Sequence, residues 1–218
     1  MSSRKRVGVL ISGRGSNMAS LIEACAAPDY PAEITLVVSN RPGAAGLEKA
    51  ADAGIATATI DHKAFSSRHA FEQELDGALI NSDVELVCNA GFMRLLTDFF
   101  VERWLDRQLN IHPSLLPAFK GLDTHQRVLD AGAMITGCTV HFVRLDTDSG
   151  PIVAQAAVPV RSDDTADSLA ARVLAAEHKL YPLALRLVAS GAAQVKGNRV
   201  VRNNASEEGP ALFWPPID

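Results

Sequence analysis

Hydrophobic residues come in short runs along this chain, and the runs alternate with segments of helical periodicity. The largely apolar runs at 6–12, 33–40, 57–60, 84–90 and 109–112 predict strands, as expected where a strand is buried on both faces. Between them, apolar residues recur every three or four positions, which predicts helices at 18–26, 44–53, 67–81 and 96–104. Strands that alternate with helices indicate a mostly parallel sheet with right-handed crossovers.

The pattern changes in the second half of the chain. A helix is predicted at 124–132, and two long strands at 135–145 and 151–159 are joined by a loop, so we expect them to extend the sheet in the antiparallel sense. A closing helix is predicted at 165–189, and we expect Pro182 to interrupt it because proline has no N–H. The prediction is a single-domain, Rossmann-like α/β fold: helices on both faces of a mixed, mostly parallel sheet with an antiparallel C-terminal extension.

Composition supports one domain. The chain has 218 residues, of which 47% are hydrophobic and 21% charged, so it can bury a sizeable core. We assign the domain to 1–202 and a loosely packed, Pro-rich tail to 203–218. The formal charge of −4 argues against broad nucleic-acid binding, and no apolar run reaches membrane-spanning length. Cys25, Cys88 and Cys138 lack CxxC spacing, so we expect reduced core thiols in a cytoplasmic protein.

The end of the predicted strand 109–112 is the first candidate for chemistry. Side chains alternate along a strand, so Asn110 and His112 should share one face while Leu109 and Ile111 pack inward. Pro113 cannot donate to a strand ladder and should end the strand there. An amide and an imidazole would then lie side by side at a strand end, where open α/β sheets bind ligands. The alternative is a polar strand end that leads into a Pro-rich loop.

A glycine-rich loop at 13–17 is the second candidate. Glycines allow a close approach of the backbone, and the N-terminus of the following helix offers free N–H groups to an anion. The third glycine of a dinucleotide-binding loop is replaced by Met18, and the next strand ends in Ser39 and Asn40 without the acid that binds a ribose. We therefore favour a phosphate monoester as the ligand, and a simple glycine turn with a capped helix is the alternative.

Two further segments follow predicted strands. Residues 89–96 combine small and apolar side chains that could wall a slot for a flat ring, although ordinary packing explains them as well. The acidic loop within 141–151 could be a solvated connection, or it could bring a carboxylate to an imidazole, which favours the charged ring and orients it. We interpret His125 and His141 as structural histidines, and no HExxH-type metal spacing is present.

Five motifs together resemble the phosphoribosylglycinamide formyltransferase family of purine synthesis. They are V-L-I-S-G-R-G-S-N-M, A-G-F-M-R-L-L, L-N-I-H-P-S-L-L-P, T-H-Q-R-V-L-D-A-G and H-F-V-x₄-D-S-G-P, and they occur in the family's order over about residues 7 to 190. The resemblance implies transfer of a formyl group from 10-formyltetrahydrofolate to the amine of 5′-phosphoribosylglycinamide. It implies small-molecule substrates without a metal, nucleic acid or membrane partner, and a monomer or a homodimer.

The resemblance also implies roles for particular residues. Asn110 would hold the formyl oxygen, His112 would act as general acid, and Asp148 would keep that histidine charged. The residues implied to bind the nucleotide are Gly15, Ser16, Asn17 and Glu177. The residues implied to bind the folate are Arg68, Met93, Arg94, Leu95, Leu96, Arg144, Leu145, Asp146 and Thr147.

The chain departs from the family pattern at two places. Ser149 stands where Asp-Gly-Gly-Pro has its first glycine, so we expect serine to adopt a backbone angle that glycine would ease. Asp123 replaces the first histidine of Gly-Leu-His-Thr-His. Three alternatives remain. Methionyl-tRNA formyltransferase shares the Asn-x-His-Pro motif, but that family has a different first loop and a further C-terminal domain, and we expect this chain to end too early to include such a domain.

Formyltetrahydrofolate hydrolase resembles this chain but carries an extra N-terminal domain. A non-catalytic nucleotide-binding module would need only the glycine loop, and it would leave Asn110, His112 and Asp148 unexplained.

Overall fold

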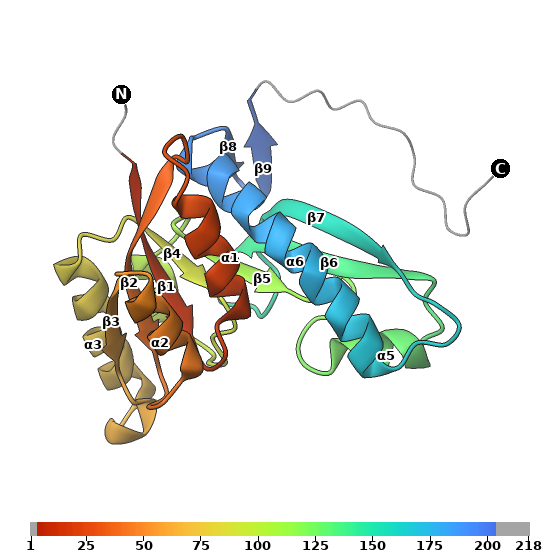
Figure 1. Ribbon diagram of the computed structural model, residues 1–218, viewed down its shortest axis with the longest axis horizontal. Coiled ribbons are helices and arrows are strands. Elements are labelled where there is room, and N and C mark those ends of the chain that lie inside the picture. Colours follow the sequence, from red (N-terminus) through yellow and green to blue (C-terminus); the bar gives the residue numbers. More distant parts are fainter. Residues whose placement is uncertain (1–3, 204–218) are drawn as a thin grey trace.

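Seven strands form one sheet through the middle of the molecule, in the spatial order β3-β2-β1-β4-β5-β6-β7 (Figure 1). The computed structural model describes residues 4–203. The strands are β1 (Lys5–Ile11), β2 (Ala32–Ser39), β3 (Ala56–Thr59), β4 (Leu86–Asn89), β5 (Gln108–His112), β6 (Ile135–Phe142) and β7 (Ile152–Pro159).

The sheet is mixed, as the sequence predicted. Strands β3, β2, β1, β4 and β5 pair in parallel, and β6 and β7 add on in the antiparallel sense. The strand order reverses between β1 and β4, because the chain moves outward to β2 and β3 before it returns to β4 on the other side of β1. Ligands of open α/β sheets bind beyond the carboxyl ends of the strands at such a switch point. The fold therefore directs attention to the loops that follow β1, β4 and β5.

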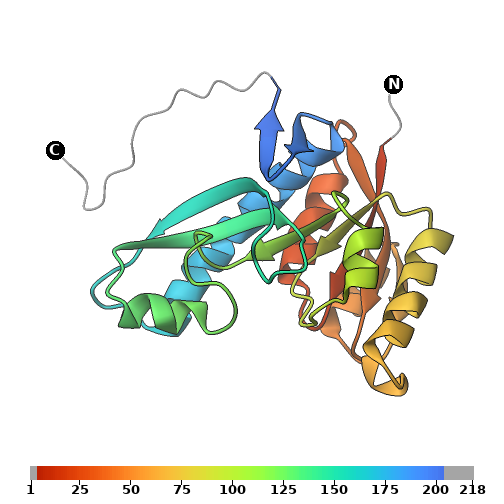
Figure 2. The same ribbon diagram turned by 180° about the vertical axis from the view of Figure 1, so that it is seen from behind.

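Helices cover both faces of the sheet, which confirms that part of the prediction. On one face, α1 (Ser16–Cys25), α2 (Ala45–Asp52), α5 (Thr124–Asp130) and α6 (Ala166–Ala189) contribute to a core that contains Leu109 and Ile111 of β5 (Figure 1). The other face, seen in Figure 2, carries α3 (Arg68–Asn81) and α4 (Asp98–Arg103). They pack onto β1, β2 and β4 through Phe71, Leu75 and Phe100, together with Trp104 just after α4. A short 3₁₀ turn, η1 (His62–Ala64), precedes α3.

The expected interruption at Pro182 is wrong. Helix α6 is continuous over 24 residues, with Pro182 inside it. It begins with a capping box in which Thr165 and Ser168 exchange hydrogen bonds, and its inward face buries Tyr181 and Leu185 completely. Proline removes one helical hydrogen bond, but burial of this apolar face on the sheet holds the helix together on either side of it.

Other elements also differ from the prediction. Helix α4 begins at Asp98 and not at residue 96, and β6 ends at Phe142 instead of 145. An unpredicted hairpin, β8 (Ala193–Lys196) and β9 (Arg199–Arg202), follows α6 and pairs antiparallel. The predicted tail lies, apart from Asn203, outside the described residues. Among residues 4–203, no helix has the length and apolar character needed to cross a membrane.

Candidate active site

Asn110 and His112 lie at the end of β5 and project from the face opposite the main core. Leu109 and Ile111 are buried against the α6 side, which confirms the predicted alternation. In the antiparallel register Asn110 is directly opposite His141 of β6, and the Asn110 Nδ2 atom is 3.3 Å from His141 Nε2. No helix is needed to cover this face, because loops 113–123 and 143–150 fold over it through the contacts described next.

Asp148 brings the loop after β6 back to the end of β5. One carboxylate oxygen is 3.2 Å from His112 Nδ1, the other is 3.7 Å from His141 Nε2, and the Gly121 N–H donates to the same carboxylate at 2.9 Å. The side chains of His112 and Asp148 expose only 7% and 10% of their surface. The structure therefore brings Asn110, His112 and Asp148 into one group, as the resemblance implied.

The surroundings of Asp148 favour its charged form. Burial alone would raise the pKa of this carboxyl group, but His141, the Gly121 N–H and a positive charge on His112 together hold the pKa below its ordinary value of 3.8. The backbone of Asp148 is left-handed, with φ +50°, a conformation that aspartate tolerates better than most residues. A negative charge is thus fixed beside the imidazole of His112.

Both ring nitrogens of His112 face acceptors. Nδ1 faces the Asp148 carboxylate, and Nε2 is 2.9 Å from the carbonyl oxygen of Phe119. Neither oxygen can donate, so Nε2 needs a proton for its hydrogen bond to Phe119, and Nδ1 needs one for the ion pair with Asp148. The geometry therefore fits the cationic imidazolium. It also shows that loop 113–123 occupies the Nε2 position in this state.

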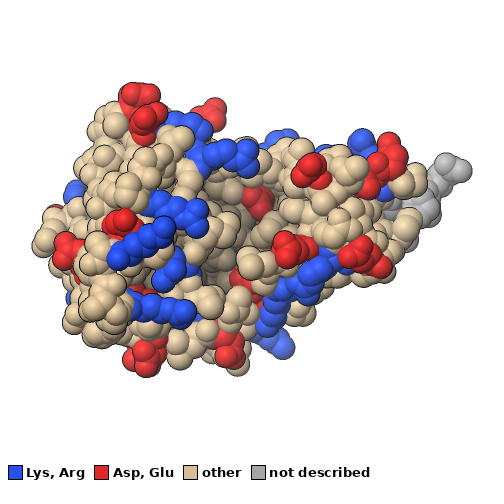
Figure 3. Space-filling model, turned by 90° about the horizontal axis from the view of Figure 1, so that it is seen from below, with Lys and Arg blue, Asp and Glu red and all other residues tan. Residues whose placement is uncertain are grey.

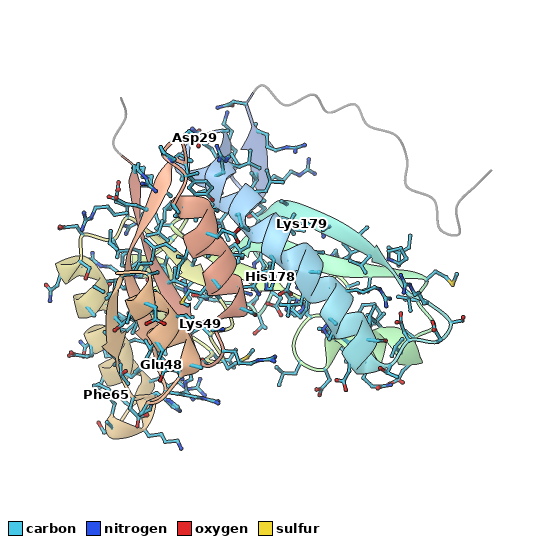
Figure 4. The ribbon with its side chains drawn as sticks, in the orientation of Figure 1. Asp29, Glu48, Lys49, Phe65, His178 and Lys179 are labelled. Atoms are coloured by element: carbon cyan, nitrogen blue, oxygen red, sulfur yellow. The ribbon has the colours of Figure 1, made fainter. Side chains whose placement is uncertain are left out.

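The glycine loop at 13–17 lies between β1 and α1. Gly15 has φ +65°, and a Cβ atom at this position would lie 3.0 Å from the Cα of Gly46 in α2, so the loop requires glycine for both its conformation and its packing. Lys49 of α2 donates to the carbonyl oxygen of Arg14 at 3.0 Å, and Figure 4 shows Lys49 beside the start of α1. Ser16 is the first residue of α1, where free N–H groups attract an anion.

Asn17 and Glu177 meet although they are far apart in the sequence. Asn17 Nδ2 donates to Glu177 Oε2 at 2.7 Å, and both residues are buried. Burial raises the pKa of Glu177, and the hydrogen bond from Asn17 offsets part of that effect. The Oδ1 atom of Asn17 is buried without a hydrogen-bond partner. The structure therefore joins the glycine loop to α6 and leaves an acceptor oxygen available at their junction.

The residues implied to bind folate fall in three places. Met93, Arg94, Leu95 and Leu96 lie in the loop between β4 and α4, and Met93 and Leu95 are each 63% exposed. Residues 144–147 lie in the loop between β6 and β7, where Leu145 is 57% exposed and Arg144 pairs with Asp106 at 2.5 Å.

Arg68 is the exposed first residue of α3. The same end of α3 contacts the start of α4, because the rings of His69 and Phe99 pack edge to face with their centroids 4.7 Å apart. Arg68 thus lies beside the loop that carries residues 93–96. Exposed apolar side chains in two of these three segments are suited to contact with a flat ring.

Figure 3 looks onto the edge at which the parallel strands end. The surface is hollowed near its middle, and Lys and Arg side chains gather along one side of the hollow. A separate cavity of about 510 Å³, lined by Lys5, Glu85 and Arg107 among others, lies at the opposite edge and contains none of the predicted site residues. Within the described residues, no group of three or more His, Cys, Asp or Glu side chains could hold a metal ion.

The sequence interpretation needs correction at Ser149. Ser149 does not adopt a positive φ; the left-handed residue of this loop is Asp148, and Ser149 Oγ donates to the carbonyl oxygen of Asp146 at 2.7 Å. The glycine that the loop requires is Gly150, because a Cβ atom there would lie 1.7 Å from the carbonyl oxygen of Phe142. His141 contacts both Asn110 and Asp148, so it supports the site directly; its place opposite Asn110 depends on strand register.

Asp123, the second departure from the family pattern, does not strain the backbone. Asp123 precedes α5 with φ +54° and makes no side-chain cap, and aspartate is among the residues that tolerate this conformation. His125, two residues after Asp123, has a buried Nδ1 atom without a partner, and burial together with nearby His112 lowers its pKa.

The three cysteines are free and buried, as expected from the sequence. Burial raises the pKa of Cys25 to about 11 and that of Cys88 and Cys138 to about 12.

Known proteins share this sequence and fold. The formyl transferase family model matches residues 5–185. Phosphoribosylglycinamide formyltransferase of Escherichia coli K12 is 44% identical over 190 residues, which cover 87% of this chain and 90% of the relative. The structure of phosphoribosylglycinamide formyltransferase from Brucella melitensis is 55% identical, with a TM-score of 0.83 over 87% of this chain and 97% of that one.

A longer relative matches over one part of its length. The trifunctional purine biosynthetic protein adenosine-3 of Bos taurus is 51% identical over 195 residues, which cover 89% of this chain and 19% of that protein. The chain thus spans about a fifth of the trifunctional protein, whereas it covers 90% of the Escherichia coli protein. Together with the strand-end group and the glycine loop, these matches show that the chain belongs to the phosphoribosylglycinamide formyltransferases of the formyl transferase family.

Proposed function

We propose that this formyltransferase takes its formyl group from 10-formyltetrahydrofolate and passes it to the amine of 5′-phosphoribosylglycinamide. The products are formylglycinamide ribonucleotide and tetrahydrofolate. The observation that carries the proposal is the group of Asn110, buried His112 and half-buried Asp148 beside the end of β5, on the same sheet edge as the glycine loop after β1. That edge can hold a phosphate and a reacting carbonyl at once.

The acceptor nucleotide would bind along the glycine loop. Gly15, Ser16 and Asn17 would receive its phosphate at the N-terminus of α1, where backbone N–H groups and the helix dipole favour an anion. Glu177 would contact the other end of the nucleotide. Its buried carboxyl group, with a pKa raised by burial, suits a hydrogen bond to a neutral or cationic donor of the ligand.

The folate would bind between the exposed apolar segments. Met93 to Leu96 and Arg144 to Thr147 would contact the flat ring, and Arg68 would pair with the carboxylate tail. Methionine and leucine side chains adapt to a planar ring without fixed polar partners. Arg94 and Arg144 would place positive charge near an anionic ligand.

The chemical step needs a charged donor beside a developing oxyanion. The acceptor amine attacks the formyl carbon, a C–N bond forms, and the carbonyl electron pair moves onto oxygen. Asn110 Nδ2 and the imidazolium of His112 would donate to that oxygen, which stabilises it before the second step. The oxyanion then collapses, the bond to the folate nitrogen breaks, and that nitrogen takes a proton from His112, which the amine proton replaces. No covalent enzyme intermediate is required.

His112 has to change one partner for this step. Its Nε2 proton faces the carbonyl oxygen of Phe119, whereas Nδ1 stays with Asp148. Substrate binding would replace the Phe119 carbonyl as the acceptor at Nε2. Asp148 lies in the separate loop 143–150, so the ring would keep this partner at Nδ1 while the Phe119 carbonyl moves away from Nε2.

We further propose that the protein acts in the cytoplasm, as a monomer or a homodimer, on small molecules alone. Three free, buried cysteines suit a reducing compartment. The formal charge of −4 gives no broad attraction to nucleic acid.

One assay tests the proposed function. Consumption of 10-formyltetrahydrofolate is followed with phosphoribosylglycinamide, with methionyl-tRNA, and with water as the only acceptor. We expect turnover with phosphoribosylglycinamide and formylglycinamide ribonucleotide as the product. Turnover only with the charged tRNA, or equally fast with water alone, would refute the proposal.

A further inference from the structure

The loop 91–97 between β4 and α4 is one of the exposed segments in the proposed donor site. It begins at Gly91, with φ +78°, and it forms neither helix nor strand up to Thr97. Met93 and Leu95 expose most of their surface, although Phe92 immediately before them is buried. An exposed apolar loop binds a flat ring well only when its backbone is already held in place, because binding otherwise has to supply the ordering entropy.

Ser12 holds the first end of this loop. Its backbone N–H donates to the carbonyl oxygen of Gly91 at 3.1 Å, and its hydroxyl oxygen accepts from the Met93 N–H at 2.8 Å. The hydroxyl proton goes to Asn40 Oδ1 at 2.6 Å. Ser12 exposes 6% of its surface and Asn40 1%, so water does not compete strongly for these bonds.

Glu72 holds the other end. This residue of α3 is fully buried, and its carboxylate accepts from both the backbone N–H of Thr97, at 2.8 Å, and the hydroxyl of the same residue. A buried carboxylate is costly unless it is hydrogen-bonded, and here both of its oxygens receive a hydrogen bond from a single residue of the loop. The Glu72 carboxylate is therefore hydrogen-bonded to the loop and shielded from solvent.

We propose that Ser12 and Glu72 are positioning residues for the formyl donor: they fix loop 91–97 at its two ends and so preorganise Met93 and Leu95 for the folate ring. This inference rests on the proposed function. Neither residue was expected to belong to the site. Ser12 ends the run before the glycine loop, and Glu72 lies on the sheet face away from the glycine-loop helix.

Removal of either anchor should affect donor binding selectively. Glu72→Met removes both hydrogen bonds to Thr97 at similar side-chain length, and Ser12→Ala removes the acceptor for the Met93 N–H. We expect each to raise the KM for 10-formyltetrahydrofolate about tenfold, equivalent to about 1.4 kcal/mol of donor binding. We expect kcat to stay within about twofold in both variants. The KM for the nucleotide should be unchanged in Glu72→Met.

Two further variants keep the test sharp. Glu72→Gln should restore a nearly normal donor KM, because its amide oxygen can accept from the Thr97 N–H while its NH₂ donates to the Thr97 hydroxyl. Glu74→Met changes the same residue type at an exposed position of the same helix and should leave all kinetic constants as they are. If Glu72→Met does not fold, Ser12→Ala and Thr97→Val, which removes only the hydroxyl contact, still decide the matter.

Hydrogen exchange supplies a readout that does not depend on catalysis. The amides of Met93 and Thr97 should exchange faster in Ser12→Ala and Glu72→Met respectively than in the wild type. Unchanged exchange, or an unchanged donor KM in an active, folded variant, would overturn the positioning role. An inactive wild type would instead refute the proposed function, so the two failures are distinguishable.

Discussion

Replacement of Asp148 by Asn tests whether this carboxylate acts through its charge. The substitution keeps the size of the side chain and an oxygen for the Gly121 N–H, and it removes the negative charge 3.2 Å from His112 Nδ1. Two unit charges at that distance attract by about 5 kcal/mol at an effective dielectric constant of ~20. Because the carboxylate also serves His141 and Gly121, we assign ~2–3 kcal/mol, the range of a charged hydrogen bond, to His112. At ~1.36 kcal/mol per tenfold, kcat at neutral pH should fall roughly 30- to 150-fold.

The loss should depend on pH. The pKa of Asp148 is lowered from 3.8 in the folded protein, so the wild type keeps its carboxylate throughout the neutral range. In Asp148→Asn the imidazolium of His112 has lost its carboxylate partner, but acid can supply the ring proton directly. The ratio of wild-type kcat to variant kcat should therefore decrease as the pH is lowered from about 8 to about 6. For folding, a lowered pKa means that the stabilisation is complete above 3.8 and is lost as the pH falls through the folded value. The variant's deficit in unfolding free energy should therefore be constant across the same range.

Tetrahydrofolate release at saturating substrates measures kcat, and the nucleotide KM should change little. Asp52→Asn, which removes an exposed carboxylate at the end of α2, serves as the control and should behave as the wild type. A kcat loss of the same size at every pH would show that Asp148 orders the Gly121 loop and does not hold the charge of His112. A nearly normal kcat would remove Asp148 from the mechanism altogether.

Three further predictions concern the rest of the site. Gly15→Ala should raise the nucleotide KM at least tenfold with little effect on the folate KM. Gly43, with a similar φ of +67° but open space around it, is the control: Gly43→Ala should cost only ~1–2 kcal/mol of backbone strain and leave the nucleotide KM and the folate KM unchanged. Asn110→Ala should lower kcat roughly 10²- to 10³-fold while thermal unfolding changes little, and an unchanged kcat would exclude it as an oxyanion donor. Glu177→Gln should keep the bond from Asn17 and raise the nucleotide KM. Because burial raises the pKa of Glu177, the contribution of its protonated form to folding stability is complete below pH 4.5 and is lost as the pH rises through the folded pKa. Thermal denaturation should therefore show a larger stability gain of Glu177→Gln over the wild type at pH ~8 than at pH ~5.

The order of strands and helices could be predicted because burial leaves a local pattern. The runs at 6–12 and 84–90 are apolar since the sheet is covered on both faces, and the two antiparallel strands were recognised by their length and by the absence of a helix between them. The hairpin of β8 and β9 was missed, although Gly197 and Asn198 form a two-residue turn signal between short alternating runs. Helix α4 begins late because Glu72 binds Thr97, a tertiary contact that periodicity cannot show.

The candidate site was only partly visible in the sequence. Strand alternation placed Asn110 and His112 on one face, and the acidic loop at 141–151 allowed a carboxylate near the imidazole, but only the family resemblance singled out Asp148. The contact requires the register in which Asn110 lies opposite His141, together with a loop that folds back over the sheet. His141 was interpreted as a structural histidine because no metal-ligand spacing accompanies it, whereas its contacts with Asn110 and Asp148 depend on pairing of β5 with β6.

The hydrogen bond between Asn17 and Glu177 joins residues 160 positions apart, and this has a consequence for synthesis of the chain. At about 5–20 residues per second, the glycine loop leaves the ribosome roughly 10 to 30 seconds before the helix that completes it. During that interval Asn17 has no Glu177 carboxylate to bind, so the proposed nucleotide site is incomplete. Under the proposed function, the nucleotide would act as a folding ligand only after α6 has docked, when its binding would selectively stabilise the finished molecule.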